Sequence, residues 1–330
     1  MRLILLTGAY GFVGTNLSIH LARAGHELWA LDLPFTTLPH SVRGVYTRRF
    51  DWEEFDTIPW DAIDTVIHLA GKAHDTRNTS DVRSYFDINV GLTQRVVDRL
   101  AAAKCKEGRK FILFSSVKAV ADHVEGVLTE DAKPNPRTPY GQSKLEAECY
   151  VREQLSGNVC VESYVLRPCM IHGPGNKGNL NLLYAAVRWG IPWPLGSFDN
   201  RRSFASIDNL VAVIDRLVAG GVAPGTYQIA DDDAISTNDL IEIMAEMLGR
   251  RTRIWRISPR LMRRVARTGD ALYLPLNSER LEKLTESYVV SNERIKRALG
   301  WERMPIPAYD GLKTTLENFS TTIVRRDTWA

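Results

Sequence analysis

Short apolar runs alternate with longer stretches of helical periodicity through the first half of the chain. Runs such as Leu3–Leu6 are apolar at every position, which is typical of strands buried on both faces of a sheet. A longer stretch places Val13, Leu17 and Leu21 on one face of a helix. The pattern predicts strands at Leu3–Leu6, Glu27–Leu33, Thr65–Leu69, Phe111–Phe114 and Cys160–Leu166, and helices at Phe12–Arg23, Val82–Ala103 and Tyr140–Leu155. This alternation predicts an α/β fold with a doubly wound parallel sheet.

The pattern changes after Arg167–Pro168, where Gly173–Gly178 has the composition of a loop. Beyond this loop we predict helices near Leu180–Trp189, Ile207–Ala219, Thr237–Leu248 and Asn292–Leu299, and a strand near Thr226–Ile229. The change predicts one domain over residues 1–175 and a smaller α/β lobe over 176–330, partly interleaved with the first.

Composition narrows the class of protein. Apolar residues make up 44% of the chain and charged residues 25%, which is ordinary for a globular protein and excludes global disorder. The 42 Lys and Arg against 39 Asp and Glu give a net charge of +3, which does not predict a nucleic-acid partner. No apolar run is long enough for a membrane span or a secretory signal, so we expect a cytoplasmic protein that begins at Met1.

The four cysteines, Cys105, Cys149, Cys160 and Cys169, show no CxxC spacing. They fall in apolar or helical stretches, so we expect buried free thiols in a reducing compartment.

A glycine-rich turn joins the first predicted strand to the first predicted helix, in the sequence TGAYGFVG from Thr7 to Gly14. Gly8 permits the tight turn, Gly11 lets backbone amides approach a pyrophosphate, and Gly14 allows close packing of helix and strand. The helix N-terminus then offers N–H groups to the anion. We therefore expect this turn to bind a dinucleotide through Gly8, Tyr10, Gly11, Phe12, Val13 and Gly14.

Asp32 ends the second predicted strand, 18 residues beyond Gly14. A carboxylate there accepts hydrogen bonds from a ribose diol and repels a 2′-phosphate, so NAD is favoured over NADP. Asp51, 19 residues beyond Asp32, is either a ligand of the adenine amine or a solvated turn carboxylate.

Tyr140 and Lys144 lie four residues apart on a predicted helix and therefore share one face. An ammonium group beside a phenol stabilises the phenolate and brings the phenol pKa toward the working range. Upstream, Ser116 follows a strand end, where its hydroxyl can hydrogen-bond a substrate oxygen. These residues are the candidate catalytic set, and no group of residues has metal-ligand spacing.

With these motifs the chain resembles the extended short-chain dehydrogenase/reductase superfamily, within its NAD-dependent epimerase/dehydratase family. Matching segments include TGAYGFVG, YGQSK from Tyr140, HLAG from His68, LRP from Leu166 and RSFASIDN from Arg202. The resemblance covers essentially the whole chain and is greatest to UDP-sugar 4-epimerases and nucleotide-sugar 4-ketoreductases. It implies a Rossmann-type domain that binds NAD, a second lobe that binds a UDP-type sugar, and a homodimer.

The resemblance also implies residue roles. Ser116 orients the sugar 4-oxygen, Tyr140 moves its proton, and Lys144 binds the nicotinamide ribose and tunes Tyr140. Further cofactor contacts are implied for Leu69, Ala70, Gly71, Asn89, Ser115, Arg167 and Pro168. Arg202 meets the diphosphate, with Arg280 or Lys283 as a second cation and Asn179 from the polar loop.

The chain departs from the family pattern near the predicted sugar site. Dehydratases carry an Asp-Glu pair after the catalytic hydroxyl, where this chain has Val117–Lys118, so we reject 4,6-dehydration. The family's usual V-Y-G is Ala119–Ala121 here, and His172 stands where the family often has tyrosine. Together these departures suggest a modified sugar, or a sugar approached differently from plain UDP-galactose. Lys118 is either a substrate contact or a solvated loop lysine, and His74 is either a substrate contact or a satisfied loop histidine.

Eight arginines fall within the 18 residues from Arg250 to Arg267, without one acid. With the apolar residues between them they predict an amphipathic basic helix. It is either a solvated face or a contact with a membrane surface, and no nucleic-acid motif accompanies it.

We therefore expect hydride transfer at C4 of a nucleotide sugar, by a 4-epimerase that passes through a 4-keto intermediate. A 4-ketoreductase is the main alternative, because it uses the same Ser–Tyr–Lys set. A sterol-type dehydrogenase and a non-catalytic NAD sensor are weaker alternatives.

Overall fold

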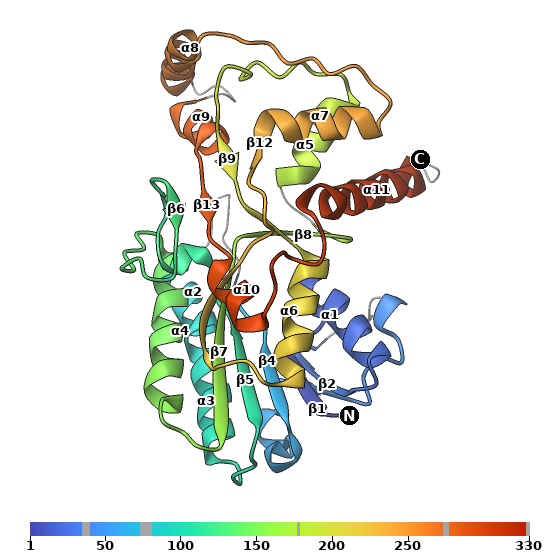
Figure 1. Cartoon of the computed structure of the whole chain (residues 1–330), viewed down its shortest axis with the longest axis vertical. Coiled ribbons are helices and arrows are strands. Elements are labelled where there is room, and N and C mark those ends of the chain that lie inside the picture. The colour runs from blue at the N-terminus through green and yellow to red at the C-terminus, as the bar shows by residue number, and fades with distance from the viewer. Residues whose placement is uncertain (35–39, 73–80, 177–178, 273–276, 328–330) are drawn as a thin grey trace.

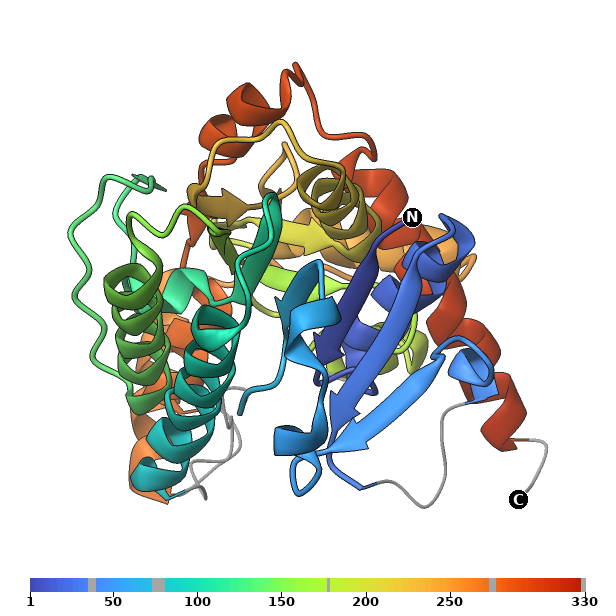
Figure 2. The same ribbon diagram turned by 90° about the horizontal axis from the view of Figure 1, so that it is seen from below.

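The structure is a computed structural model that describes residues 1–34, 40–72, 81–176, 179–272 and 277–327. Its main sheet has seven strands in the order β11-β7-β5-β4-β1-β2-β3, and every neighbouring pair is parallel. Helices cover both faces of this sheet (Figures 1 and 2). The predicted doubly wound α/β fold is thus confirmed.

The strands of the main sheet are buried along most of their length because helices lie on both faces. Their bounds are β1 Leu3–Thr7, β2 Glu27–Asp32, β3 Arg48–Asp51, β4 Thr65–His68, β5 Arg109–Phe114, β7 Val161–Pro168 and β11 Gly225–Ile229. The predicted strands overlap β1, β2, β4, β5, β7 and β11 to within two residues at each end. Residues 225–229 extend this sheet beyond β7, so the second half of the chain contributes a strand to it.

The helices divide into two layers. On one face α1 Phe12–Arg23 and α6 Ile207–Ala219 pack with α10 Glu293–Leu299, and both α1 and α6 have the predicted bounds. On the other face lie α2 Val82–Asn89, α3 Gly91–Ala102 and α4 Pro139–Leu155.

The prediction of one helix over Val82–Ala103 is wrong, because the chain divides into α2 and α3 at Val90. Asn89 ends α2, and its side chain bonds to backbone atoms of Lys72 in the loop after β4. Apolar periodicity continues through both helices, so the sequence pattern does not reveal the division.

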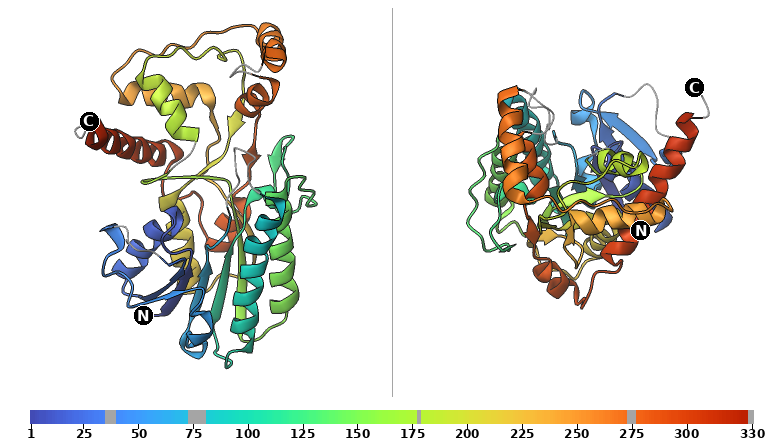
Figure 3. Two further views of the ribbon diagram at one scale, coloured as in Figure 1. Left: turned by 180° about the vertical axis from the view of Figure 1, so that it is seen from behind. Right: turned by 90° about the horizontal axis from the view of Figure 1, so that it is seen from above.

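The C-terminal lobe lies beyond the carboxyl ends of the sheet strands (Figures 1 and 3). Its core joins α5 Asn179–Arg188, α7 Thr237–Met247 and α11 Ala308–Asp327, and a smaller cluster joins α8 Pro259–Leu272 to α9 Ser278–Thr285. Short strand pairs lie in and beside the lobe. They are β8 Met170–His172 with β10 Phe204–Ser206, β9 Arg201–Arg202 with β12 Ile235–Ser236, and β6 Val127–Leu128 with β13 Val289–Val290.

The arginine-rich stretch is helical only from Pro259 onward. Residues before it are extended, since Trp193 and Trp255 exchange backbone hydrogen bonds with the opposing segments. The expectation of one helix through this stretch is therefore wrong in its first half. Ile254 and Arg256 pair with Trp193 and Leu195 instead.

The expectation of four free thiols is also wrong. Cys105 and Cys160 form a disulfide, whereas Cys149 and Cys169 are free. The two bonded cysteines precede neighbouring strands, because Arg109 of β5 pairs with Val161 of β7. A spacing of 55 residues gives no local signal of this proximity.

Candidate active site

The candidate site begins where the strand order reverses, at the carboxyl ends of β1 and β4. Gly8 has φ +64°, and a Cβ there would lie 2.8 Å from the amide nitrogen of Ala70. A Cβ on Gly14 would lie 2.5 Å from the carbonyl oxygen of Gly8. Glycine at both positions is therefore required for the turn to pack between α1 and the loop after β4. In open α/β sheets this reversal is the usual place for a nucleotide.

Asp32 lies against the glycine-rich turn. Its carboxylate accepts a hydrogen bond of 2.8 Å from the backbone N–H of Tyr10. Asp51 stands beside Asp32 in the register of β2 and β3. One of its oxygens accepts from the backbone N–H groups of Glu53 and Glu54, at 2.9 and 3.0 Å, as in a local turn.

The N-terminus of α1 points toward the same region. Gly11 is the N-cap and supplies no side chain to the first-turn N–H groups, which therefore suit an external acceptor. The Phe12 ring lies 3.5 Å from the position that a Cβ on Gly173 would take. The loop that follows β8 is thus placed beside the glycine-rich turn, as the resemblance implies.

Tyr140 lies in the first turn of α4, which Thr138 caps by accepting from the N–H of Gly141. Its ring meets that of Tyr85 edge to face, with centroids 6.3 Å apart. Burial raises the pKa of Tyr140, while a side-chain hydrogen bond with Ser116 lowers it. The structure therefore brings two members of the predicted catalytic set together, from α4 and from the end of β5.

Lys144 is buried one turn further along α4. Its ammonium donates a 3.0 Å hydrogen bond to the carbonyl of Phe114, the last residue of β5. Burial lowers the pKa of Lys144 to about 8. The carboxylate of Glu148 has the opposite, smaller effect and raises this pKa. A Cβ on Gly71 would lie 3.0 Å from this ammonium, so the loop after β4 passes directly over Lys144.

Asn89 joins that loop to α4. Its side-chain oxygen accepts from the N–H of Lys72 at 2.8 Å, and its amide donates to the Ser143 hydroxyl at 2.9 Å. Asn89 is 1% exposed, so these bonds hold residues 70–72 in place beside Lys144.

A buried charged network lies behind the candidate catalytic residues. The Arg167 guanidinium at the end of β7 donates to both oxygens of Glu148, at 2.9 and 3.1 Å from Nε. The Ser115 hydroxyl donates to the same carboxylate. Arg167 and Ser115 are thus held by Glu148, and their predicted cofactor contacts stay predictions.

Glu148 was not among the residues predicted from the sequence. A signal was present, because Tyr140, Lys144 and Glu148 follow one another at intervals of four residues on a single helical face.

Two of the residues predicted for the substrate side, Lys118 and Arg202, lie beside Tyr288. The Lys118 ammonium is 4.2 Å from the centroid of the Tyr288 ring and donates to the carbonyl of Asp122 at 2.7 Å. Burial lowers the pKa of Lys118. The backbones of Arg202 and Tyr288 form an isolated parallel β-bridge. The Arg202 guanidinium donates to the carbonyls of Glu286 and Lys283. Tyr288, which the sequence analysis did not assign to the site, therefore connects Lys118 with Arg202.

Other residues predicted for the substrate side lie on helices α9 and α5. Arg280 is exposed in the first turns of α9, Lys283 pairs with Glu279 at 2.6 Å, and Asn179 begins α5. His74 lies outside the described residues. His172 is fully buried between Thr315 and Asp231, so in this structure its ring belongs to the core of the lobe.

Among the described residues we find no group of three or more His, Cys, Asp or Glu side chains suited to a metal ion. The same residues contain no helix that is both long and apolar enough to cross a membrane.

The chain is similar to known proteins over most of its length. The chain is 29% identical to UDP-glucose 4-epimerase of Vibrio cholerae, over 96% of this chain and 95% of that protein. It is 29% identical to GDP-6-deoxy-D-mannose reductase of Pseudomonas aeruginosa, over 74% and 79% of the two chains. The crystal structure of UDP-glucuronic acid 4-epimerase from Bacillus cereus with NAD has the same fold, with a TM-score of 0.74, 18% identity and coverage of 97% and 99%. Residues 4–230 match the family profile itself, and the chain therefore belongs to the NAD dependent epimerase/dehydratase family.

Proposed function

We propose that the protein is an NAD-dependent enzyme that acts at C4 of a UDP-type nucleotide sugar through a 4-keto intermediate, as a 4-epimerase. The observation that carries this proposal is the placement of Ser116, Tyr140 and Lys144 at the carboxyl edge of the sheet, beside the Gly8–Ala70 contact. A non-catalytic NAD sensor has no use for this set.

The residues around the strand reversal fit NAD. Gly8 and Gly14 allow the turn to pack against neighbouring backbone, the first-turn N–H groups of α1 suit a pyrophosphate, and Asp32 lies where a ribose diol needs an acceptor. When bound, NAD takes up and returns the hydride of the sugar. We propose that it is held by Gly8, Tyr10, Gly11, Phe12, Val13, Gly14, Asp32, Asp51, Leu69, Ala70, Gly71, Asn89, Ser115, Tyr140, Lys144, Arg167 and Pro168.

In the proposed mechanism Tyr140 removes the proton of the sugar C4 hydroxyl, which Ser116 orients by a hydrogen bond. The hydrogen bond with Ser116 opposes the effect of burial on the Tyr140 pKa, and we propose that the Lys144 ammonium stabilises the phenolate once it forms. The carbonyl of Phe114 holds that ammonium in place. Tyr140 returns the proton when the ketone is reduced.

Lys118, His74, Asn179, Arg202 and Arg280 are proposed to bind the substrate. The position of Lys118 between Ser116 and Tyr288 supports a contact with the sugar, and the half-buried guanidinium of Arg202 supports a contact with the diphosphate. A homodimer and the division into a cofactor domain and a substrate lobe stay predictions.

Two measurements test the proposal. An epimerase regenerates its cofactor and can retain it, so we expect purified protein to carry NAD and to interconvert C4 epimers of a UDP-sugar without added cofactor. A 4-ketoreductase would instead consume reduced cofactor with each turnover, and the Pseudomonas relative is named as a reductase. Tight binding of a sterol with no binding of UDP would contradict the nucleotide-sugar assignment.

Arg202→Ala is expected to raise the apparent KM for the nucleotide sugar about 10–100-fold, because a charge-assisted contact with the diphosphate is lost. The effect on kcat should be smaller, since the contact is present in ground and transition states. Arg202→Lys should recover part of the affinity, because a point charge lacks the guanidinium fork.

Steady-state kinetics and calorimetry with UDP measure this effect. Arg201→Ala is the matched control, because the neighbouring side chain in β9 points to the opposite side and is exposed. Equal loss of affinity in both variants would contradict the specific role of Arg202.

Asp32→Ala is expected to weaken NAD binding and to narrow the preference over NADP. The substitution removes both the acceptor for the ribose diol and the charge that repels a 2′-phosphate. Fluorescence titration with both cofactors measures the change, and Asp51→Ala tests the adenine contact separately. Equal affinity of the unmodified protein for NAD and NADP would contradict the role of Asp32.

A further inference from the structure

Residues 250–272, here called the arginine-rich cap, form the end of the C-terminal lobe that is farthest from the main sheet (Figure 1). All eight arginines of the cap are exposed: Arg250, Arg251, Arg253, Arg256, Arg260, Arg263, Arg264 and Arg267. Within the described part of the chain, no carboxylate forms an ion pair with any of them. The cap is therefore a concentrated positive surface on a protein whose net charge is only +3.

Helix α8 carries two distinct apolar stripes. Met262, Ala266 and Gly269 are buried, and the first two pack against Leu281 of α9. Leu261, Val265 and Leu272 are exposed and follow one another at helical intervals, so they form a second stripe beside the first. Leu261 is 52% exposed and Leu272 62%. The protein core accounts for the first stripe only.

The arginines of α8 share the rest of its surface with Thr268 and with Asp270, whose carboxylate is bonded to Ser278. With about 100° of rotation per residue, Arg260, Arg264 and Arg267 lie opposite the buried stripe, Arg263 flanks that stripe, and Arg264 borders the exposed one. A helix with an exposed apolar stripe beside a basic face has the pattern of one that lies in a membrane interface.

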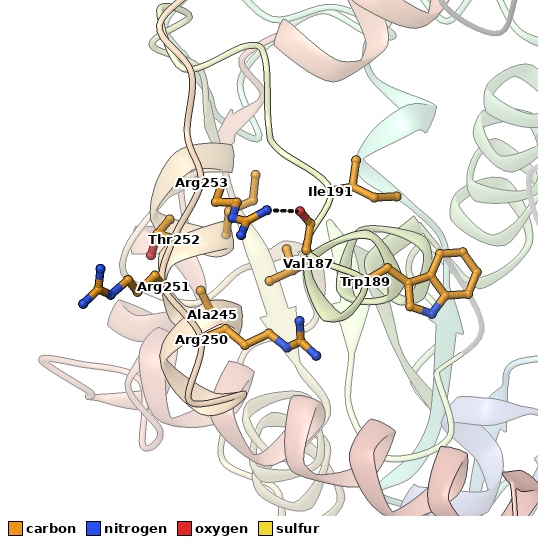
Figure 4. Close-up of a pocket in the computed structure, with 10 residues that line it drawn as sticks. Val187, Trp189, Ile191, Ala245, Arg250, Arg251, Thr252 and Arg253 are labelled. Atoms are coloured by element: carbon orange, nitrogen blue, oxygen red, sulfur yellow. Dashed lines mark hydrogen bonds between the residues drawn. The ribbon is translucent and has the colours of Figure 1, made fainter.

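The extended half of the cap, before Pro259, also exposes a tryptophan among arginines. Trp255 is 55% exposed, and Trp189 and Ile191 lie beside Arg250, Arg251 and Arg253 around a cavity of about 380 Å³. Trp189 is 76% exposed and points outward in Figure 4. Figure 4 also shows Arg253 bonded to the Gly190 carbonyl, whereas Arg250 and Arg251 extend away from the backbone. Tryptophan with arginine around apolar residues suits the headgroup level of a bilayer.

We propose that the arginine-rich cap binds the surface of a bilayer that contains anionic phospholipids. The arginines match the negative surface, and the exposed stripe of α8 with Trp255 and Trp189 enters the boundary between headgroups and acyl chains. A second copy of this chain is disfavoured, because a symmetric contact through the cap would bring like charges together. A nucleic acid would leave the apolar stripe without a partner.

The cap is connected to the candidate active site through α9. Leu281 packs on α8, and two residues later the carbonyl of Lys283 accepts from Arg202. Membrane binding would thus hold the substrate side of the site close to the bilayer. The proposal itself does not depend on the proposed reaction.

Vesicle flotation of the full-length protein tests the proposal. We expect binding to phosphatidylcholine vesicles that contain about one-third phosphatidylglycerol, weaker binding as salt rises, and little binding to pure phosphatidylcholine. Absence of binding to the anionic vesicles at low salt, or equal binding to both kinds, would overturn the proposal.

Two double variants separate charge from apolar insertion. Arg260→Gln/Arg264→Gln is expected to lower the partition coefficient about 20-fold, and Leu261→Ser/Val265→Ser about 10-fold. Because all four side chains are exposed, the unfolding midpoint and NAD affinity should not change. Arg23→Gln/Arg152→Gln removes the same charge from exposed positions on α1 and α4 and should bind vesicles like the unmodified protein.

Equal losses in the cap and control variants would overturn the assignment to the cap. Unchanged binding by the Leu261→Ser/Val265→Ser variant would overturn insertion of α8. If the protein does not bind vesicles, and the Leu261→Ser/Val265→Ser variant still binds duplex DNA, the cap would be assigned to nucleic acid instead.

Discussion

Tyr140→Phe is expected to lower kcat about 10³-fold while leaving the affinity for NAD and for the nucleotide sugar nearly unchanged. The substitution removes one hydroxyl, and with it the proposed proton transfer, which general acid–base catalysis makes worth about 10²–10⁴ in rate. The ring keeps its edge-to-face contact with Tyr85, so the packing of α4 should persist. Ser116→Ala should lower kcat less, by about 10²-fold, because it removes a positioned hydrogen bond rather than the base.

Single-turnover kinetics with a UDP-sugar measures this effect apart from product release. Tyr150→Phe is the matched control, because it removes a hydroxyl from the same helix where the partner is the exposed carboxylate of Asp98. Its turnover should stay at the level of the unmodified protein. Retention of more than a few per cent of activity by Tyr140→Phe would contradict the assignment of Tyr140 as the base.

The parts of the fold that local patterns specify could be predicted from the sequence. Fully apolar runs require burial on both faces, which only a helix-covered parallel sheet provides, and the bounds of α1 and α6 follow from helical periodicity. The glycine-rich turn is equally local, because Gly8 and Gly14 are needed by the backbone of the turn itself.

Features that depend on strand register could not be predicted in this way. The Cys105–Cys160 disulfide exists because β5 and β7 are neighbours, although 55 residues separate the two cysteines. Tyr288 directly precedes β13, and the pairing of β13 with β6 brings its ring to Lys118. These two strands lie in opposite halves of the sequence. Each pairing is a property of the tertiary arrangement, and neither residue type nor spacing indicates it.

Family resemblance supplied the candidate roles of Arg167 and Ser115 but not their partner. Both side chains are directed to Glu148, whose position on the face of Tyr140 and Lys144 gave the only local hint. The structure thus suggests that Glu148 positions the end of β5, the end of β7 and the lysine ammonium relative to one another.

Glu148→Ala is expected to lower the free energy of unfolding by about 3–5 kcal/mol, because it leaves the guanidinium of Arg167 buried without a counter-charge. The Arg167 side chain is only 4% exposed, and the Glu148 side chain is fully buried. Bulk water therefore cannot solvate the guanidinium in place of the lost carboxylate. Denaturant titration followed by circular dichroism measures the change. Glu146→Ala, on the exposed face of the same helix, should change the free energy by much less.

Glu148→Gln separates positioning from stability, because the amide oxygen still accepts hydrogen bonds but carries no charge. The Glu148 carboxylate raises the pKa of Lys144, which burial lowers to about 8. Without that charge the Lys144 pKa falls further, so the ammonium is lost at lower pH. If the charged ammonium supports the phenolate of Tyr140, the alkaline limb of the kcat profile should move to lower pH in Glu148→Gln and stay in place in Glu146→Gln. A loss of stability with an unmoved profile would make Glu148 a purely structural residue, since a scaffold role alone gives no reason for the pH dependence of turnover to change.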